Sequence, residues 1–299
     1  MVEELYTDLM KLTPEEVEER LVFWREEFDG ERREQFSTTE YVFSQDEAER
    51  FMEYLHTLMF AKHFEESAFI LPFIRDYLDK MKMQAGDVVW LIELIIEWNY
   101  VAIRFISFDK NSFGEYEFLR EIIDITEGKD GALKLKNRQA KLGLLTAYHY
   151  WLKQGGIIGV FEEKIFKDEQ TWIEELNNTF LPSILEELSV QTIAKNYEFV
   201  VQIKRALARY YIQNNMPNEG LVLLKELLVD LENYKEKSEA EVADLNMEIG
   251  TMLTQYKKYG SAKPYFISAK EQYEKLGEEF ETFAYQAEGW IEECEAKNK

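Results

Sequence analysis

The spacing of small and large apolar residues over positions 249–269 constrains the fold more than any other feature of this chain. Two helices that pack closely need a position with almost no side chain where they approach each other, and larger side chains beside it to fill the grooves. Small and large residues occur here at the spacing that such a pair requires, which predicts two short antiparallel helices. They are Gly250, Leu253, Ala262, Phe266 and Ala269.

The rest of the chain also favours helices over strands. The 299 residues include only 14 glycines and 5 prolines, so helix breakers are scarce. Ser44 followed by Glu47 is typical of a capped helix start, because each side chain can bond a backbone N–H of the first turn. No segment alternates apolar and polar residues over the length of a strand. We therefore expect an all-α fold, with a new helix start or a kink at Pro72.

The chain is strongly acidic. It has 35 Lys and Arg residues against 58 Asp and Glu residues, which gives 35 − 58 = −23. Such a surface repels phosphate backbones, so we expect no direct nucleic-acid partner. The field favours a basic or neutral ligand. The single Cys294 cannot form an internal disulfide, and the first ten residues carry no basic residue, unlike a secretory signal. These features are typical of a cytoplasmic protein.

Residues 88–108 are strongly apolar and imitate a membrane span. Three charged side chains interrupt them, Glu93, Glu97 and Arg104. Each charge costs about 2.5–3.5 kcal/mol at the centre of a bilayer, so we expect no membrane partner but a helix buried on nearly all sides. With about 100° per residue, these side chains and Tyr100 share one narrow stripe. This polar edge either lines a pocket or is an outer face closed by an Arg–Glu pair.

A polar, turn-like segment at residues 127–131 divides the chain. The helix signals after this segment are more regular than those before it. We therefore expect an N-terminal helical region of divergent repeats over residues 1–130, followed by a helical-repeat region over residues 131–299.

The apolar pattern described first resembles the signature of a tetratricopeptide repeat. That family places a small residue where its two helices approach most closely, and small and large residues in turn along the second helix. The match is best over residues 239–276 and fair over residues 200–234, where Leu227 replaces the usual alanine. The two copies are 250 − 208 = 42 residues apart, against ~34 in an ideal repeat. The alternative is a helical-hairpin array that meets the pattern by packing convergence. The second copy consists of Ala208, Tyr211, Gly220, Leu224 and Leu227.

The resemblance implies antiparallel helical hairpins stacked as a right-handed superhelix. One hairpin cannot bury its own apolar face, so neighbours stack and share a core. In this family the first helix of each hairpin lines the concave side, where a peptide or protein segment usually binds. Carried onto this chain, the inward-facing residues come from three helices. They are Lys141, Tyr148 and Trp151, then Gln202, Arg205, Arg209 and Gln213, and finally Asp244, Thr251 and Gln255.

Two basic residues of this set, Arg205 and Arg209, share a helix face in a very acidic chain. They could hold a carboxylate such as a peptide C-terminus, because guanidinium groups bind carboxylates well. The alternative is that they pair with Glu and Asp on neighbouring helices. Gln202 and Gln213 each offer a donor and an acceptor to an extended backbone. The Lys and Asn arrangement with which some members of the family hold an acidic tail is not present.

Motifs for catalysis are weak. Glu53 and His56 have the Glu-x-x-His spacing of carboxylate-bridged di-iron bundles, which need a second such pair. Neither of the other two histidines has an acidic residue three positions before it, so we expect neither a metal nor another cofactor. The enzymatic alternative is an α-helical enzyme with clustered carboxylates, built around these two residues, Glu93 and Glu97.

The sequence therefore predicts a non-enzymatic adaptor or regulatory receptor that binds a peptide or protein segment in a concave groove. A more specific version is similar to the helical-repeat peptide-pheromone receptors of Gram-positive bacteria. Those commonly join the repeats to a DNA-binding helix-turn-helix, and residues 1–65 show no such module. A homodimer is a further alternative for the partner.

Overall fold

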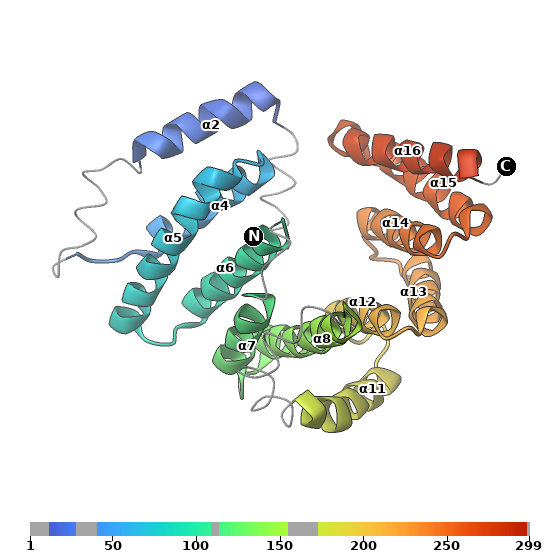
Figure 1. The fold of residues 1–299 in the computed structure, drawn as a ribbon, viewed down its shortest axis with the longest axis horizontal. Coiled ribbons are helices and arrows are strands. Elements are labelled where there is room, and N and C mark those ends of the chain that lie inside the picture. Colours follow the sequence, from blue (N-terminus) through green and yellow to red (C-terminus); the bar gives the residue numbers. More distant parts are fainter. Residues whose placement is uncertain (1–11, 28–40, 109–113, 155–172, 298–299) are drawn as a thin grey trace. The chain divides into compact units, whose positions relative to one another are not determined.

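The computed structural model describes residues 12–27, 41–108, 114–154 and 173–297. Helices make up most of this part of the chain, and it contains no strand (Figure 1), so the all-α prediction is confirmed. A π-helical turn over Leu176–Phe180 precedes α11, and a 3₁₀ turn over Glu278–Phe280 precedes α16. In chain order the α-helices are α2 (Pro14–Glu27), α4 (Gln45–Phe60), α5 (Phe64–Ala85), α6 (Val89–Phe108), α7 (Gly114–Thr126), α8 (Gly131–Gln154), α11 (Leu181–Val190), α12 (Tyr197–Gln213), α13 (Pro217–Glu232), α14 (Glu239–Gln255), α15 (Tyr259–Leu276) and α16 (Glu281–Lys297).

The chain forms two compact units, unit 1 (Met1–Asn137) and unit 2 (Arg138–Lys299), which divide inside α8. The sequence suggested a boundary after residue 130, at the turn before this helix. The first turns of α8 belong to unit 1 because Asn137 is buried against α7. Its side-chain nitrogen donates to the carbonyl of Ile123 over 3.1 Å and to the hydroxyl of Thr126 over 3.0 Å.

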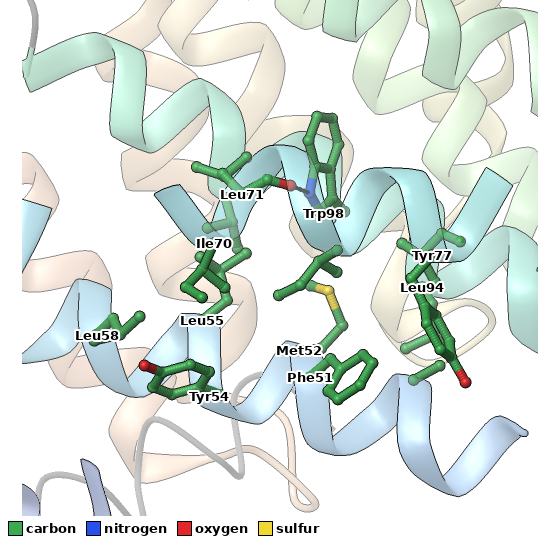
Figure 2. Packing of buried hydrophobic residues seen from close by; sticks show 14 of the residues in the cluster. Phe51, Met52, Tyr54, Leu55, Leu58, Ile70, Leu71, Tyr77, Leu94 and Trp98 are labelled. Carbon is green, nitrogen blue, oxygen red and sulfur yellow. Dashed lines mark hydrogen bonds between the residues drawn. The ribbon is translucent and has the colours of Figure 1, made fainter. Parts of the chain in front are cut away.

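The core of unit 1 includes buried residues from α4, α5 and α6 (Figure 2). The ring of Phe51 on α4 makes edge-to-face contacts with Phe73 and Tyr77 on α5. The indole N–H of Trp98 on α6 donates to the carbonyl of Leu71 over 2.9 Å. This bond satisfies two buried polar groups that would otherwise cost free energy on folding. The three helices are therefore joined by apolar packing and by a buried hydrogen bond.

Helix α6 is buried on nearly all sides, as its sequence predicts. Leu91, Leu94, Ile95 and Trp98 are all buried, whereas Glu93 is exposed. Within the described residues, no helix has the length and apolar character needed to cross a membrane. The apolar stretch at residues 88–108 thus contributes to the core of unit 1.

Helices that are next but one to each other along the chain are also in contact in unit 1. Nε2 of His56 on α4 lies 2.6 Å from Oε1 of Glu97 on α6. Arg75 on α5 donates to both carboxylate oxygens of Glu121 on α7, each over 2.5 Å. Polar side chains therefore link α4 to α6 and α5 to α7.

Glycines mark the closest approach of two helix pairs in unit 2. A Cβ added to Gly250 on α14 would lie 2.6 Å from Cε1 of Phe266 on α15. A Cβ added to Gly220 on α13 would lie 2.7 Å from the carbonyl oxygen of Ala208 on α12. Side chains at these positions would push the partners apart, so the predicted small residues do lie where helices meet. The other residues of the two patterns are buried except Tyr211, which is half-buried.

Alternate helices in unit 2 run side by side in the same direction. Tyr197 near the start of α12 donates to Glu241 near the start of α14. Further along both helices, Arg205 donates to Glu248 over 2.8 Å. A cation–π contact likewise joins α13 to α15. The pairs α12–α13 and α14–α15 therefore lie next to each other with their first helices aligned.

The predicted new helix start at Pro72 is wrong. This proline lies inside α5, which runs from Phe64 to Ala85. Proline in a helix interior removes one backbone hydrogen bond and crowds the preceding turn. Here Pro72 is exposed, whereas its neighbours Leu71 and Ile74 are buried in the core. The packing of α5 against α4 and α6 therefore outweighs the local preference of the proline.

Candidate functional site

The predicted groove residues of α12 and α14 include two arginines that converge on one carboxylate. Nε of Arg205 lies 2.8 Å from Oε2 of Glu248, and Nε of Arg209 lies 3.2 Å from Oε1 of the same residue. One turn separates the two arginines on α12, so both reach the same point on α14. The arginines therefore pair with an acid on a neighbouring helix, which is the second of the two alternatives that the sequence left open.

Exposure differs strongly between the two arginines. The side chain of Arg205 is 27% exposed and that of Glu248 is 19% exposed, so this pair is largely covered. The side chain of Arg209 is 62% exposed. A guanidinium group carries five N–H donors, and the bond to Glu248 uses the Nε–H of Arg209. The terminal nitrogens of Arg209 are therefore the groups through which this site can meet a ligand.

A tyrosine and an aspartate continue the polar site one turn earlier on α14. The hydroxyl of Tyr273 on α15 donates to Oδ1 of Asp244 over 2.5 Å. Burial raises the pKa of Tyr273 above its ordinary value, the Asp244 carboxylate raises it further, and Arg205 opposes the shift. The phenol therefore stays protonated at neutral pH and holds Asp244 in place. The residues Arg205, Arg209, Asp244, Glu248 and Tyr273 are called the arginine cluster below.

The glutamine predicted at the start of this face is held by another glutamine. Nε2 of Gln139 on α8 donates to Oε1 of Gln202 over 2.5 Å, and Gln202 in turn donates to Glu198 over 3.3 Å. Oε1 of Gln139 is buried and has no hydrogen-bond partner. A buried acceptor without a partner costs free energy on folding. Gln139 and Gln202 thus form an amide pair beside the arginine cluster.

The remaining predicted site residues are less informative. The ammonium group of Lys141 lies 5.7 Å from the ring centre of Phe180. Gln213 and Thr251 are half-buried, and Gln255 is exposed. The side chains of Tyr148 and Trp151 lie outside the described residues. These residues therefore stay predictions as parts of a binding surface.

Sequence reasoning missed three members of this site, Glu248, Tyr273 and Gln139. Glu248 follows Asp244 by one helical turn, so the period of α14 could have placed it on the predicted face. Tyr273 and Gln139 lie on other helices, at 29 residues from Asp244 and 63 residues from Gln202. No local pattern connects residues so far apart, so only the packed structure identifies these partners.

A cavity of about 420 Å³ in unit 1 is a second candidate site, and it lies between α4 and α6. Its volume falls within the range of ~300–1,000 Å³ that small-ligand sites occupy. Glu97 is the one residue of the predicted polar edge among those that line this cavity, so the first of the two alternatives for that edge holds for Glu97 only. Glu93 and Arg104 are exposed, and burial raises the pKa of Tyr100 to about 12. The lining residues are Asp46, Glu49, Arg50, Met52, Glu53, Leu94 and Glu97.

The predicted Glu-x-x-His pair takes two different positions at this cavity. Glu53 lines the cavity and forms an ion pair with Arg20 on α2, over 2.6 Å. His56 is 1% exposed and lies behind Glu97. In the part of the chain that the structure describes, no three His, Cys, Asp or Glu side chains are grouped as metal ligands. The two residues of the pair therefore contact different partners, Arg20 and Glu97.

No protein-family model matches the chain, and neither a curated protein nor a solved structure matches it. The tetratricopeptide resemblance therefore rests on the sequence residues that carry it.

Proposed function

We propose that the chain is a non-enzymatic helical-repeat protein of the tetratricopeptide type, in which α12 and α14 form the wall of a groove for a peptide or protein segment. The observation that carries this proposal is the parallel order of the two helices, since Tyr197 meets Glu241 and Arg205 meets Glu248. The partners are 241 − 197 = 44 and 248 − 205 = 43 residues apart. This offset is close to the 42-residue spacing of the two sequence patterns. Stacked repeats have such a fixed offset because each repeat contacts the next.

The arginine cluster supplies the recognition chemistry in this proposal. Its two arginines balance Asp244 and Glu248, so its formal charge is 2 − 2 = 0 in a chain of charge −23. A carboxylate therefore meets less repulsion here than over most of the surface. Glu248 holds Arg209 in position, which lowers the entropy lost when its exposed nitrogens bind. The C-terminal carboxylate of a peptide fits this chemistry.

The amide pair supports an extended peptide beside the carboxylate. Gln202 is half-buried, and its side-chain amide has both a donor and an acceptor for a peptide backbone. Gln202 lies one turn before Arg205 on α12, so the amide pair and the cluster follow the same helix face. A segment bound along α12 would meet the amides first and the guanidinium groups next. The adaptor and the regulatory-receptor versions share this mode of binding.

A selection from a library of peptides with free C-termini tests the proposal. The recovered peptides are then synthesised with a free or an amidated C-terminus, and their affinities for the full chain are measured by calorimetry. Arg209→Ala leaves Arg205 to hold Glu248, so we expect this variant to keep the fold. We expect Arg209→Ala and C-terminal amidation each to weaken binding about tenfold or more, because each removes a charge-assisted hydrogen bond.

The matched control for this experiment is Lys235→Ala, which removes an exposed positive charge between α13 and α14. This variant should bind the peptides as the unaltered chain does. The proposal fails if Arg209→Ala and Lys235→Ala have the same affinity for every recovered peptide, or if the library gives no saturable binder.

A further inference from the structure

The cavity in unit 1 lies between alternate helices, as the arginine cluster of unit 2 does. α4 and α6 supply all of its lining residues, and the contact between His56 and Glu97 joins the two helices at this point. α12 and α14 have the same relation in unit 2, where Arg205 and Glu248 join them. Both units therefore carry a polar site between helices that are next-but-one in the sequence. The two sites differ in their charge.

Carboxylates dominate the cavity. Asp46, Glu49, Glu53 and Glu97 line it, and Arg50 is the only basic residue among the lining residues. The Arg20 guanidinium lies 2.6 Å from Glu53. With Arg20 and Arg50 set against the four carboxylates, the formal charge of the cavity is 2 − 4 = −2. Glu97 is held by the buried His56, so one carboxylate has a fixed position. The cavity therefore attracts a cation, and the attraction rises as water is displaced.

Two apolar residues in the lining distinguish this cavity from a patch of acidic side chains on a surface. Met52 is 2% exposed and Leu94 is 1% exposed, and both belong to the core of unit 1 (Figure 2). The two residues therefore form an apolar floor beneath the carboxylates, at the outer boundary of the core between α4 and α6. Long cationic side chains match these two parts of the cavity, because they have a methylene stem that packs on apolar surface and a charged end.

We propose that this cavity binds a guanidinium or ammonium group carried on an alkyl stem, with the stem against Met52 and Leu94 and the charged end among Glu49, Glu53 and Glu97. An arginine or lysine side chain of a polypeptide has this chemistry, and so has a free alkylammonium compound. A simple metal ion fits less well, because it would leave the apolar part of the cavity unfilled and because Arg50 repels it. The site is separate from the arginine cluster and does not depend on it.

Calorimetry of the full chain with small probes tests this inference. The probes are N-acetylarginine amide, its neutral isostere N-acetylcitrulline amide, the diamine putrescine, and a short peptide with one central arginine. We expect the arginine probe to bind and the citrulline probe not to bind. The double variant Glu49→Gln/Glu53→Gln should weaken the arginine probe about tenfold or more, because it removes two charged hydrogen-bond acceptors. The control variant Glu226→Gln/Glu292→Gln removes the same amount of charge from two exposed carboxylates of unit 2. It should leave the affinity for the arginine probe unaltered.

A variant that is expected to strengthen binding distinguishes a loss of the site from unfolding, because unfolding can only weaken binding. Arg50→Gln removes the positive charge that competes for the carboxylates, so it should strengthen binding of the arginine probe. Tighter binding of the peptide than of the free probes assigns the site to a polypeptide side chain, whereas equal or tighter binding of putrescine assigns it to a free alkylammonium compound. The inference is overturned if no cationic probe binds saturably at millimolar concentration, if citrulline binds as well as arginine, or if Arg50→Gln fails to strengthen binding.

The result is independent of the proposed function of unit 2. Arg209→Ala should leave binding of the arginine probe unaltered, and Glu49→Gln/Glu53→Gln should leave binding of the selected peptides' free C-terminus unaltered. Failure of one set of variants therefore does not count against the other site.

Discussion

The ring of Phe266 lies against the backbone of Gly250, at the position where α14 and α15 come closest. Gly250→Ala would bring a Cβ within 2.6 Å of that ring, so we expect a loss of about 1–3 kcal/mol in the free energy of unfolding. Gly289→Ala in α16 is the matched control, since nothing lies within 4 Å of the added Cβ. It should stabilise the fold by about 0.5–1 kcal/mol through helix propensity. Urea denaturation measures both, and shifts of equal sign would contradict the close approach.

The phenol of Tyr273 makes stability depend on alkaline pH. Its pKa in the folded chain lies above the ordinary 10.0, mainly through burial and then through Asp244. The unfolded chain therefore loses this proton at a lower pH than the folded chain does. The contribution to stability is complete below pH 10.0 and falls as the pH rises above it, by about 1.4 kcal/mol per pH unit at most. Urea unfolding from about pH 9 to about pH 11 should show a shallower decline for Tyr273→Phe. Parallel declines of the two proteins would disprove this role of the buried phenol.

The arginine cluster illustrates what residue types alone can predict. Arg205 and Arg209 are conspicuous in an acidic chain, and their spacing puts them on one face of α12. Whether these arginines bind the carboxylate of a ligand or one within the chain depends on Glu248, which is 43 residues from Arg205. Distances of that kind follow from the packing of whole helices. The sequence therefore indicated the basic residues of this site and left their partner undecided.

At the scale of elements, Arg75 connects three helices of unit 1. It bonds Glu121 on α7 with both terminal nitrogens and lies 5.1 Å from the ring centre of Trp98 on α6. Arg75→Ala should lower the free energy of unfolding by about 1–3 kcal/mol, because it leaves Glu121 without its bidentate partner. Lys80→Ala removes an ion pair within the same helix and should change stability by less than about 0.5 kcal/mol. Denaturation curves of the two variants compare these effects. An equal loss from Lys80→Ala would show that charge alone, and not the link between helices, is responsible.

Helix boundaries show how far local patterns reach. The capped start at Ser44 is confirmed for one of its two bonds, since its side chain accepts from the backbone N–H of Glu47. The predicted return bond is wrong, because the N–H of Ser44 donates to the hydroxyl of Tyr77 over 3.2 Å and Glu47 accepts from the same hydroxyl. Pro72 shows the limit, because α5 continues through it. A cap acts within one turn and depends on few other residues. The continuation past a proline depends on how α5 packs against α4 and α6, which no local pattern contains.

At the scale of the molecule, the charge of −23 opposes compaction. The repulsion between exposed carboxylates is screened when the ionic strength rises, since the Debye length falls from about 30 Å at 0.01 M to about 8 Å at 0.15 M. We therefore expect Tm to increase with sodium chloride over this range at neutral pH, as measured by calorimetry. Salt also weakens the ion pairs, but carboxylates outnumber basic groups by 58 to 35, so the repulsive contribution should dominate. A Tm that falls with salt would show that the ion pairs outweigh the net charge.

The helical class and the close pairing of α14 with α15 could be predicted from the amino-acid sequence. Both depend on residues near each other along the chain: the scarcity of glycine and proline, the helical period, and a glycine opposite a phenylalanine. The contacts between distant side chains could not be predicted in this way, because their proximity depends on the packing of many helices at once. Glu97 meets His56 across 41 residues and lines a cavity, while Arg205 meets Glu248 across 43 residues. The two candidate sites arise from such encounters between alternate helices.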